Sequence, residues 1–125
     1  MEKILIIEDE DALAKVLGEK FRQEKFEVRI VDDGEKALPA VRQFMPNMVL
    51  LDLILPGKSG FEVLKEMKGD PELERIPVIV LSNLGEDESI KEALSLGAKD
   101  YFVKTQHPIN EVVDKVKEKL LSPGA

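Results

Sequence analysis

The sequence predicts an α/β fold, a single doubly wound domain in which five strands alternate with five helices. Five short, β-rich apolar runs recur along the chain, and their centres are separated by 24, 21, 29 and 23 residues. Each interval leaves room for one helix, as a parallel sheet requires. The predicted strands are Lys3–Ile7, Glu27–Val31, Met48–Leu51, Val78–Leu81 and Asp100–Val103.

Each segment that follows a predicted strand has an apolar stripe with the i, i+3, i+4 spacing of a helix. The third segment begins with the capping pattern Ser59-x-x-Glu62 and ends at Gly69. Pro39 lies inside the second, where it removes an amide donor and crowds the carbonyl of Glu35, so we expect a kink or a late helix start. The stripes are Leu13, Val16, Leu17 and Phe21; Ala37, Leu38 and Val41; Phe61, Leu64 and Met67; Ile90, Ala93 and Leu94; and Ile109, Val112, Val113, Val116 and Leu120.

Length and composition favour one globular unit. The chain has 125 residues, 43% of them apolar, with 25 acidic and 18 basic side chains and a formal net charge of −7. We expect one domain over residues 1–125 and no output domain. Zero cysteines exclude a disulfide scaffold, a thiolate zinc site and a thiol nucleophile. No apolar run approaches the ~20 residues of a membrane span and no basic stripe is present, so we expect a cytoplasmic protein without membrane insertion or direct nucleic-acid binding.

The chemically informative side chains stand where the predicted strands end. Glu8 and Asp9 follow the first strand, Asp52 the third, Ser82 the fourth and Lys104 the fifth. In the sheet order 2-1-3-4-5, which is the flavodoxin-like order, strands one and three are neighbours and all carboxyl ends share one edge. Three carboxylates converging there repel one another unless a cation or a proton intervenes. Oxygen ligands alone select a hard ion, so we expect Mg²⁺ as the cofactor.

This set of groups is suited to accepting a phosphoryl group. Asp52 can attack phosphorus as the nucleophile, while the metal and Lys104 stabilise charge on the equatorial oxygens. The hydroxyl of Ser82 can donate a hydrogen bond to one of those oxygens. The expected product is an aspartyl phosphate.

The chain resembles the receiver domain of response regulators in two-component signalling, over residues 3–121. Four segments carry the resemblance, and they occur in order at the ends of the expected strands. They are Ile4-Leu5-Ile6-Ile7-Glu8-Asp9-Glu10, Val49-Leu50-Leu51-Asp52-Leu53-Ile54-Leu55-Pro56-Gly57, Val80-Leu81-Ser82 and Tyr101-Phe102-Val103-Lys104.

The resemblance implies roles for the acidic residues. Asp52 matches the phosphoacceptor, which takes a phosphoryl group from a phosphohistidine on a sensor histidine kinase or a histidine phosphotransfer protein. Asp9 matches the acid that binds Mg²⁺ directly, and Glu8 the acid that usually binds it through water. The backbone carbonyl of Ile54 matches a further metal ligand.

The resemblance also implies a conformational switch. Ser82 and Tyr101 match a pair in which the hydroxyl is drawn to the phosphoryl group and the ring turns inward. The surface of helix four, strand five and helix five then changes, and with it the affinity for a downstream protein. Such a chain is not an enzyme but a switch that assists its own phosphorylation and slow dephosphorylation. It is either a stand-alone receiver, like the chemotaxis and sporulation kinds, or part of a longer regulator.

Among the departures from the family pattern, two bear directly on the phosphoryl site. Thr105 follows Lys104 where the family typically has a proline after a cis bond, and a cis bond before a non-proline residue costs about 3 kcal/mol. The resemblance therefore does not fix the direction in which the Lys104 side chain points. Ile54 and Leu84 are apolar where relatives that lose phosphate quickly often carry polar side chains, which favours a long-lived phosphoryl state.

Other interpretations compete with this one. Glu8 and Asp9, considered alone, could cap the first predicted helix. Five chemically suitable residues at one predicted edge of the sheet instead favour a functional site. A phosphatase of the haloacid-dehalogenase kind would need a second Asp at the position of Ile54 as its general acid. A flavodoxin-like cofactor binder would need a Gly/Ser/Thr-rich loop in place of the four acids 8–11. A receiver-like interaction module that is never phosphorylated is the main alternative, with Thr105 as its only support.

Overall fold

The computed structural model describes residues 2–121, so the Ser122-Pro123-Gly124 segment, expected to end the last helix, lies outside the described residues. Five strands and five α-helices alternate along the chain, with one 3₁₀ turn, η1, before α2. The elements are β1 (Lys3–Ile7), α1 (Asp11–Gln23), β2 (Glu27–Val31), η1 (Gly34–Lys36), α2 (Ala37–Phe44), β3 (Met48–Leu51), α3 (Gly60–Lys68), β4 (Val78–Ser82), α4 (Asp87–Ser95), β5 (Asp100–Val103) and α5 (Ile109–Leu121).

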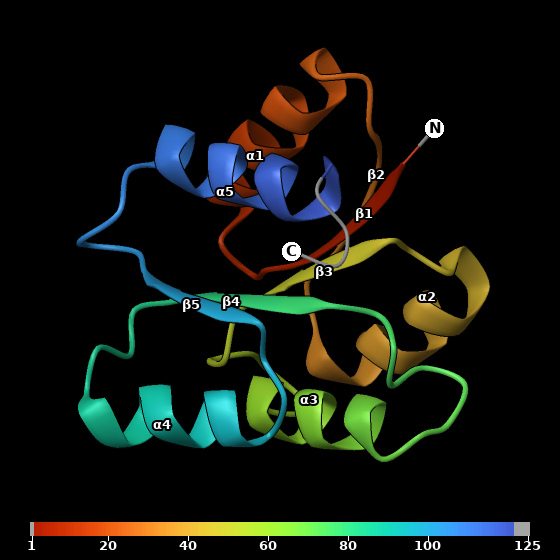
Figure 1. Ribbon diagram of the computed structural model, residues 1–125, viewed down its shortest axis with the longest axis vertical. Helices are drawn as coiled ribbons and strands as arrows, with labels where there is room; N and C mark the ends of the chain where they lie inside the picture. The colour runs from red at the N-terminus through yellow and green to blue at the C-terminus, as the bar shows by residue number, and fades with distance from the viewer. Residues whose placement is uncertain (1, 122–125) are drawn as a thin grey trace.

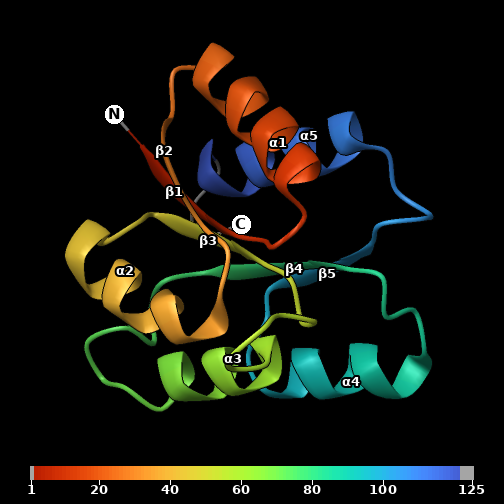
Figure 2. The same ribbon diagram turned by 180° about the vertical axis from the view of Figure 1, so that it is seen from behind.

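The five strands form one parallel sheet in the order β2-β1-β3-β4-β5, as predicted. Helices α1 and α5 cover one face of the sheet, and α2, α3 and α4 cover the other (Figures 1 and 2). This doubly wound arrangement confirms the predicted fold class. The chain reverses its direction of winding between β1 and β3, and ligands bind at the carboxyl ends of such neighbouring strands.

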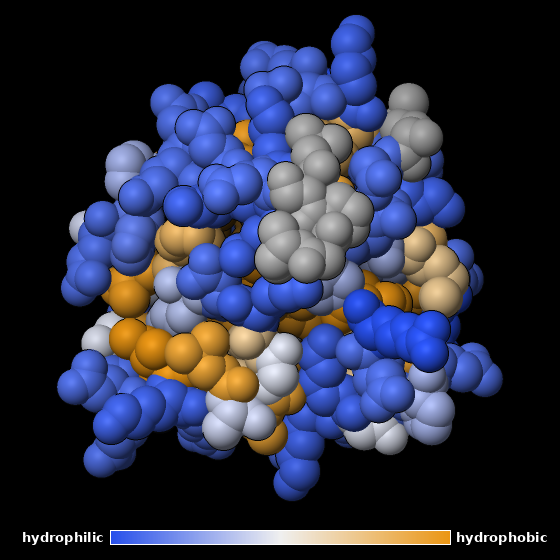
Figure 3. Space-filling view, in the orientation of Figure 1, coloured by the Kyte–Doolittle hydropathy of each residue, from blue (hydrophilic) through white to orange (hydrophobic). Residues whose placement is uncertain are grey.

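Both faces of the sheet are buried, which explains why the strands are almost uninterrupted apolar runs. Side chains alternate between the two faces, so Ile4 and Ile6 pack with α1 and α5, whereas Leu5 and Ile7 pack with α2 and α3. In the space-filling view, hydrophilic side chains cover much of the outer surface of both helix layers (Figure 3). Within residues 2–121, no helix combines the length and the apolar character needed to cross a bilayer.

Two local sequence signals act as expected. The Ser59 hydroxyl caps α3 by accepting a hydrogen bond from the Glu62 amide at 3.3 Å. Helix α2 begins late, at Ala37, so Pro39 lies in the first turn, where an amide has no acceptor within the helix. Strand β4 extends one residue further than predicted, because Ser82 pairs with Val103 of β5.

Gly60 lies directly against the strand end that carries Asp52. A Cβ atom at Gly60 would lie 2.2 Å from the backbone oxygen of Asp52 and 2.6 Å from the Cα of Leu53. Real Cβ atoms do not approach backbone so closely, so a side chain here must displace the β3–α3 connection.

We therefore expect Gly60→Ala to lower the free energy of unfolding by about 2 kcal/mol, as overpacking typically does. Urea unfolding followed by circular dichroism measures this change. Gly85→Ala is the matched control, because its Cβ would meet only the Val103 side chain at 3.4 Å. Equal unfolding midpoints for Gly60→Ala and the wild type would contradict the prediction.

Candidate functional site

The register between β1 and β3 brings two acidic residues side by side. Ile7 is paired with Leu51, so the residues that follow them, Glu8 and Asp52, leave the sheet together. The Asp52 amide donates to the Ile7 carbonyl at 3.0 Å and continues the ladder by one step. Two residues 44 positions apart in the sequence therefore occupy neighbouring places at the carboxyl edge of the sheet.

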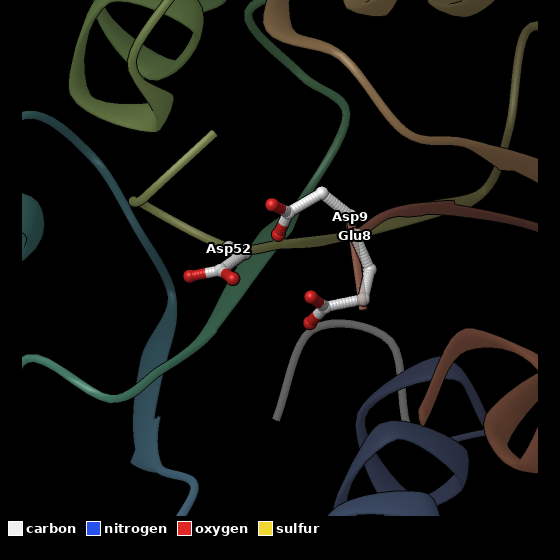
Figure 4. Close-up of side chains that lie close together, drawn as sticks. All are labelled: Glu8, Asp9 and Asp52. Atoms are coloured by element: carbon white, nitrogen blue, oxygen red, sulfur yellow. The ribbon is translucent and has the colours of Figure 1, made fainter. Parts of the chain in front are cut away.

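Asp9 completes a group of three carboxylates. Glu8, Asp9 and Asp52 each offer one oxygen, and these three oxygens lie within 4.8 Å of one another. Their carboxylates point toward a common space in Figure 4. Glu8 is 2% exposed and Asp52 4%, whereas Asp9 is exposed to solvent. The group thus has two buried members and one on the solvent side.

Lys104 brings a positive charge to this group from the end of β5. Its Nζ lies 2.9 Å from Glu8 Oε1 and 2.9 Å from Asp52 Oδ2, so one ammonium bridges the two buried carboxylates. The Lys104 backbone amide donates to the Ser82 carbonyl at 2.8 Å, which anchors the start of the β5–α5 turn to β4. Glu10, which the sequence reasoning did not assign to the site, also contacts Nζ at 3.3 Å.

Backbone amides hold the remaining oxygens of the buried carboxylates. The Ile54 amide donates to Asp52 Oδ1 at 3.2 Å, and the Glu10 amide donates to Glu8 Oε2 at 3.0 Å. Each buried carboxylate therefore has one oxygen on Lys104 and the other on a backbone N–H. These contacts orient both groups, because hydrogen bonds to an ionised oxygen are about twice as strong as neutral ones.

The protonation of the site reflects its burial. Burial raises the pKa of Glu8 to about 7, although the Glu10 amide and Lys104 favour its charged form. Burial would by itself lower the pKa of Lys104, but its hydrogen bonds with Glu8 and Asp52 outweigh this effect and raise that pKa above its usual value. Lys104 therefore carries its positive charge throughout the neutral range.

Ser82 and Tyr101 meet through a shared neighbour, Leu84. Ser82 is fully buried, and its Oγ accepts a hydrogen bond from the Leu84 amide at 3.3 Å. The Tyr101 hydroxyl donates to the Leu84 carbonyl at 2.5 Å, and its ring is 8% exposed and thus turned inward. Burial and the charge of Glu86 raise the pKa of Tyr101, so its hydroxyl remains a donor.

The donor set fits a hard divalent cation. The predicted ligands Glu8, Asp9 and Asp52 are brought together, and all three offer oxygen. Within residues 2–121, the Lys104 ammonium alone opposes four carboxylates here, those of Glu8, Asp9, Asp52 and Glu10, so negative charge is in excess even after ion pairing. The ligand role of the Ile54 carbonyl stays a prediction.

Known proteins share this sequence and architecture. Residues 4–117 match the response regulator receiver domain. Sporulation initiation phosphotransferase F of Bacillus subtilis (strain 168) is 39% identical over 119 residues, which cover 95% of this chain and 94% of that protein. The phosphate regulon transcriptional regulatory protein PhoB of Rhizobium meliloti (strain 1021) is 38% identical over 102 residues, which cover 82% of this chain and 45% of that protein.

The chain thus spans about half the length of PhoB, and the same holds for the DNA-binding response regulator MtrA of Mycolicibacterium smegmatis. Among solved structures, the phosphorylated cyanobacterial phytochrome response regulator RcpA superimposes with a TM-score of 0.86 at 34% identity. That match covers 99% of this chain and 96% of RcpA. Because profile, sequence and structure agree over nearly the full length, the chain belongs to the response regulator receiver domain family.

Proposed function

We propose that this chain is a phosphorylation-activated switch in which Asp52 accepts a phosphoryl group from a phosphohistidine. The donor is a sensor histidine kinase or a histidine phosphotransfer protein. The observation that carries the proposal is the Lys104 ammonium, held 2.9 Å from both Glu8 and Asp52 beside the exposed carboxylate of Asp9. This arrangement combines an oriented nucleophile, a fixed positive charge and a set of metal ligands.

In the transfer step, an oxygen of Asp52 forms a bond to phosphorus while the bond from phosphorus to the donor imidazole nitrogen breaks. The electron pair of that broken bond stays on the imidazole. Lys104 already contacts an Asp52 oxygen, so its ammonium is in place to stabilise charge on the incoming phosphoryl oxygens. The Ser82 hydroxyl, which accepts a bond from the Leu84 amide, still has its proton available to donate to phosphate.

Glu8, Asp9, Asp52 and the backbone carbonyl of Ile54 are the proposed ligands of Mg²⁺, which when bound offsets the negative charge of the phosphoryl group. The excess of carboxylates over ammonium groups supports this assignment. We place the protein in the cytoplasm, where histidine kinases present their phosphohistidine. The absence of a membrane-spanning helix among residues 2–121 is compatible with that location.

We propose that Leu84 couples Ser82 at the phosphoryl site to Tyr101 in β5. Its amide contacts Ser82 and its carbonyl contacts Tyr101, so a movement of Ser82 toward phosphate acts on the residue that holds the ring. Tyr101 lies in β5 and packs in the same core cluster as α4, which places it under the face formed by α4, β5 and α5. A change on this face alters the affinity for a downstream protein by shifting the population of two states.

The first expected outcome concerns the acceptor. Incubation with acetyl phosphate and Mg²⁺ should add one phosphoryl mass to the wild type, measured by intact mass spectrometry. Asp52→Asn should remove this gain, whereas Asp114→Asn, on the exposed surface of α5, should retain it. A folded wild-type protein that gains no phosphoryl group would favour the interaction-only module instead.

The second outcome concerns the lifetime of the phosphoryl group. The Ile54 side chain is 52% exposed at the rim of the site and cannot orient an attacking water. We expect the isolated phosphoprotein to lose its phosphate over hours, and Ile54→Asn to speed this loss about tenfold by holding a water. The control is Met45→Asn, an equally exposed apolar residue outside the site. Loss from the wild type within minutes would contradict the prediction.

The third outcome concerns the cation. At about a hundred times its dissociation constant, Mg²⁺ should stabilise the wild type by about 2.7 kcal/mol, as linkage requires. Asp9→Asn should remove most of this gain, because it removes one carboxylate ligand. It should also modestly stabilise the protein in Mg²⁺-free buffer, since it relieves repulsion with Glu8 and Asp52.

Thermal unfolding with and without Mg²⁺ measures both effects. Glu19→Gln, on the exposed face of α1, makes the same change in net charge away from the site and serves as the control. An Asp9→Asn variant that Mg²⁺ stabilises as strongly as the wild type would show that Asp9 is not a ligand.

A further inference from the structure

The turn that carries Lys104 lies at an exposed edge of the sheet. In the described part of the chain, β5 pairs only with β4, so the backbone groups on its outer side have no neighbouring strand there. On the inner side, the Lys104 amide is bonded to the Ser82 carbonyl at 2.8 Å. Thr105 occupies the position at which the family's proline would stiffen the turn, and within residues 2–121 no peptide bond is cis. Contacts on the outer side of this turn therefore come from groups other than a neighbouring strand.

His107 contacts the end of β5 with both its backbone and its ring. The His107 amide donates to the Val103 carbonyl at 3.1 Å, and the Gln106 amide donates to the same oxygen at 2.9 Å. The ring nitrogen Nδ1 of His107 lies 3.2 Å from the Val103 amide and 3.2 Å from the Val103 carbonyl oxygen. Either tautomer therefore has a partner on Val103, as acceptor from the amide or as donor to the carbonyl.

The ring of His107 is also fixed in direction. It packs edge-on against Phe102, with ring centroids 5.1 Å apart and an interplanar angle of 80°. Phe102 is buried between the sheet and the layer of α1 and α5, so the imidazole rests on a rigid part of the core. The polar side of the ring faces the backbone of Val103, one residue before Lys104.

We propose that His107 is a positioning residue for Lys104, holding the outer side of the β5–α5 turn as Ser82 holds its inner side. The inference rests on the proposed role of Asp52 and Lys104 in phosphoryl transfer. The His107 imidazole contacts the backbone of Val103, and the Lys104 amide is hydrogen-bonded to Ser82 of β4. Together these contacts fix the backbone at Lys104 and therefore the direction in which its side chain leaves the backbone. That direction brings Nζ to both Glu8 and Asp52.

A structural role alone and a positioning role predict different kinetics. Lys104 stabilises charge that develops during transfer, so a shifted ammonium lowers the maximal rate more than it changes the apparent KM. Displacement of a catalytic group by about 1 Å can cost up to about a hundredfold in rate. The imidazole restrains the turn without touching the reacting groups, so we expect a smaller effect.

The experiment measures phosphorylation of the full chain by acetyl phosphate at saturating Mg²⁺. His107→Phe keeps a ring against Phe102 but removes Nδ1, and should lower the maximal rate about fivefold with KM changed less than about twofold. His107→Asn places an amide oxygen near the position of Nδ1 and should restore the rate to within about twofold of the wild type. Gln106→Ala, whose side chain is exposed in the same turn, is the control and should match the wild type.

A double-mutant cycle then tests whether His107 acts through Lys104. In a Lys104→Ala background, His107→Phe should produce no further loss of rate, because the group that it positions is already absent. A full additional loss in that background would overturn the inference, and so would a folded His107→Phe variant with the maximal rate of the wild type.

Amide NMR separates this inference from the proposed function. The Val103 amide proton, if Nδ1 accepts, or the Val103 carbonyl carbon, if Nδ1 donates, should move upfield in His107→Phe and return toward its original position in His107→Asn, with or without phosphorylation. If the wild type gains no phosphoryl group, the proposed function fails, and the positioning of Lys104 is judged by this shift and by the Lys104 ammonium resonance. An unchanged Val103 signal in His107→Phe would overturn the inference by itself.

Discussion

The ammonium of Lys104, shared between Glu8 and Asp52, is the interaction on which the site depends. Two buried carboxylates side by side are costly, since each loses its hydration and each repels the other. One positive charge placed 2.9 Å from both reduces that cost, and the backbone amides of Glu10 and Ile54 satisfy the remaining oxygens. The parallel sheet makes this possible, because it delivers the ends of β1, β3 and β5 to one edge.

The compensation is incomplete. Asp9 and Glu10 add two further carboxylates beside a single ammonium, and burial still raises the pKa of Glu8 to about 7. A site optimised only for stability would not keep this excess of negative charge. The excess instead gives the site a preference for cations, and it leaves Lys104 under competition among three carboxylates. An incoming phosphoryl group therefore meets an ammonium whose existing contacts are shared and can be rearranged.

Much of this could be predicted from the sequence, because strands buried on both faces must be apolar runs and parallel strands must be separated by helices. The same reasoning placed Glu8, Asp9, Asp52 and Lys104 at one edge, since that placement needs only the strand ends and the sheet order. The contacts within loops could not be predicted in this way. Glu10 reaches Lys104 across 94 residues, and His107 contacts Val103 through the shape of a turn. Such contacts leave no periodic pattern in the sequence from which they could be predicted.

The position of Lys104 in the chain has a consequence for biosynthesis. Every carboxylate of the site is translated before residue 53, whereas their shared counter-charge follows the last strand. A nascent chain that has emerged only through β4 can bring β1 and β3 together but lacks Lys104, whose ammonium bridges Glu8 and Asp52 in the folded protein. Until Lys104 has been made, the repulsion between these two carboxylates lacks the ion pairs that offset it in the folded protein. The ion pairs at the acidic edge can therefore form only after the last strand has been synthesised.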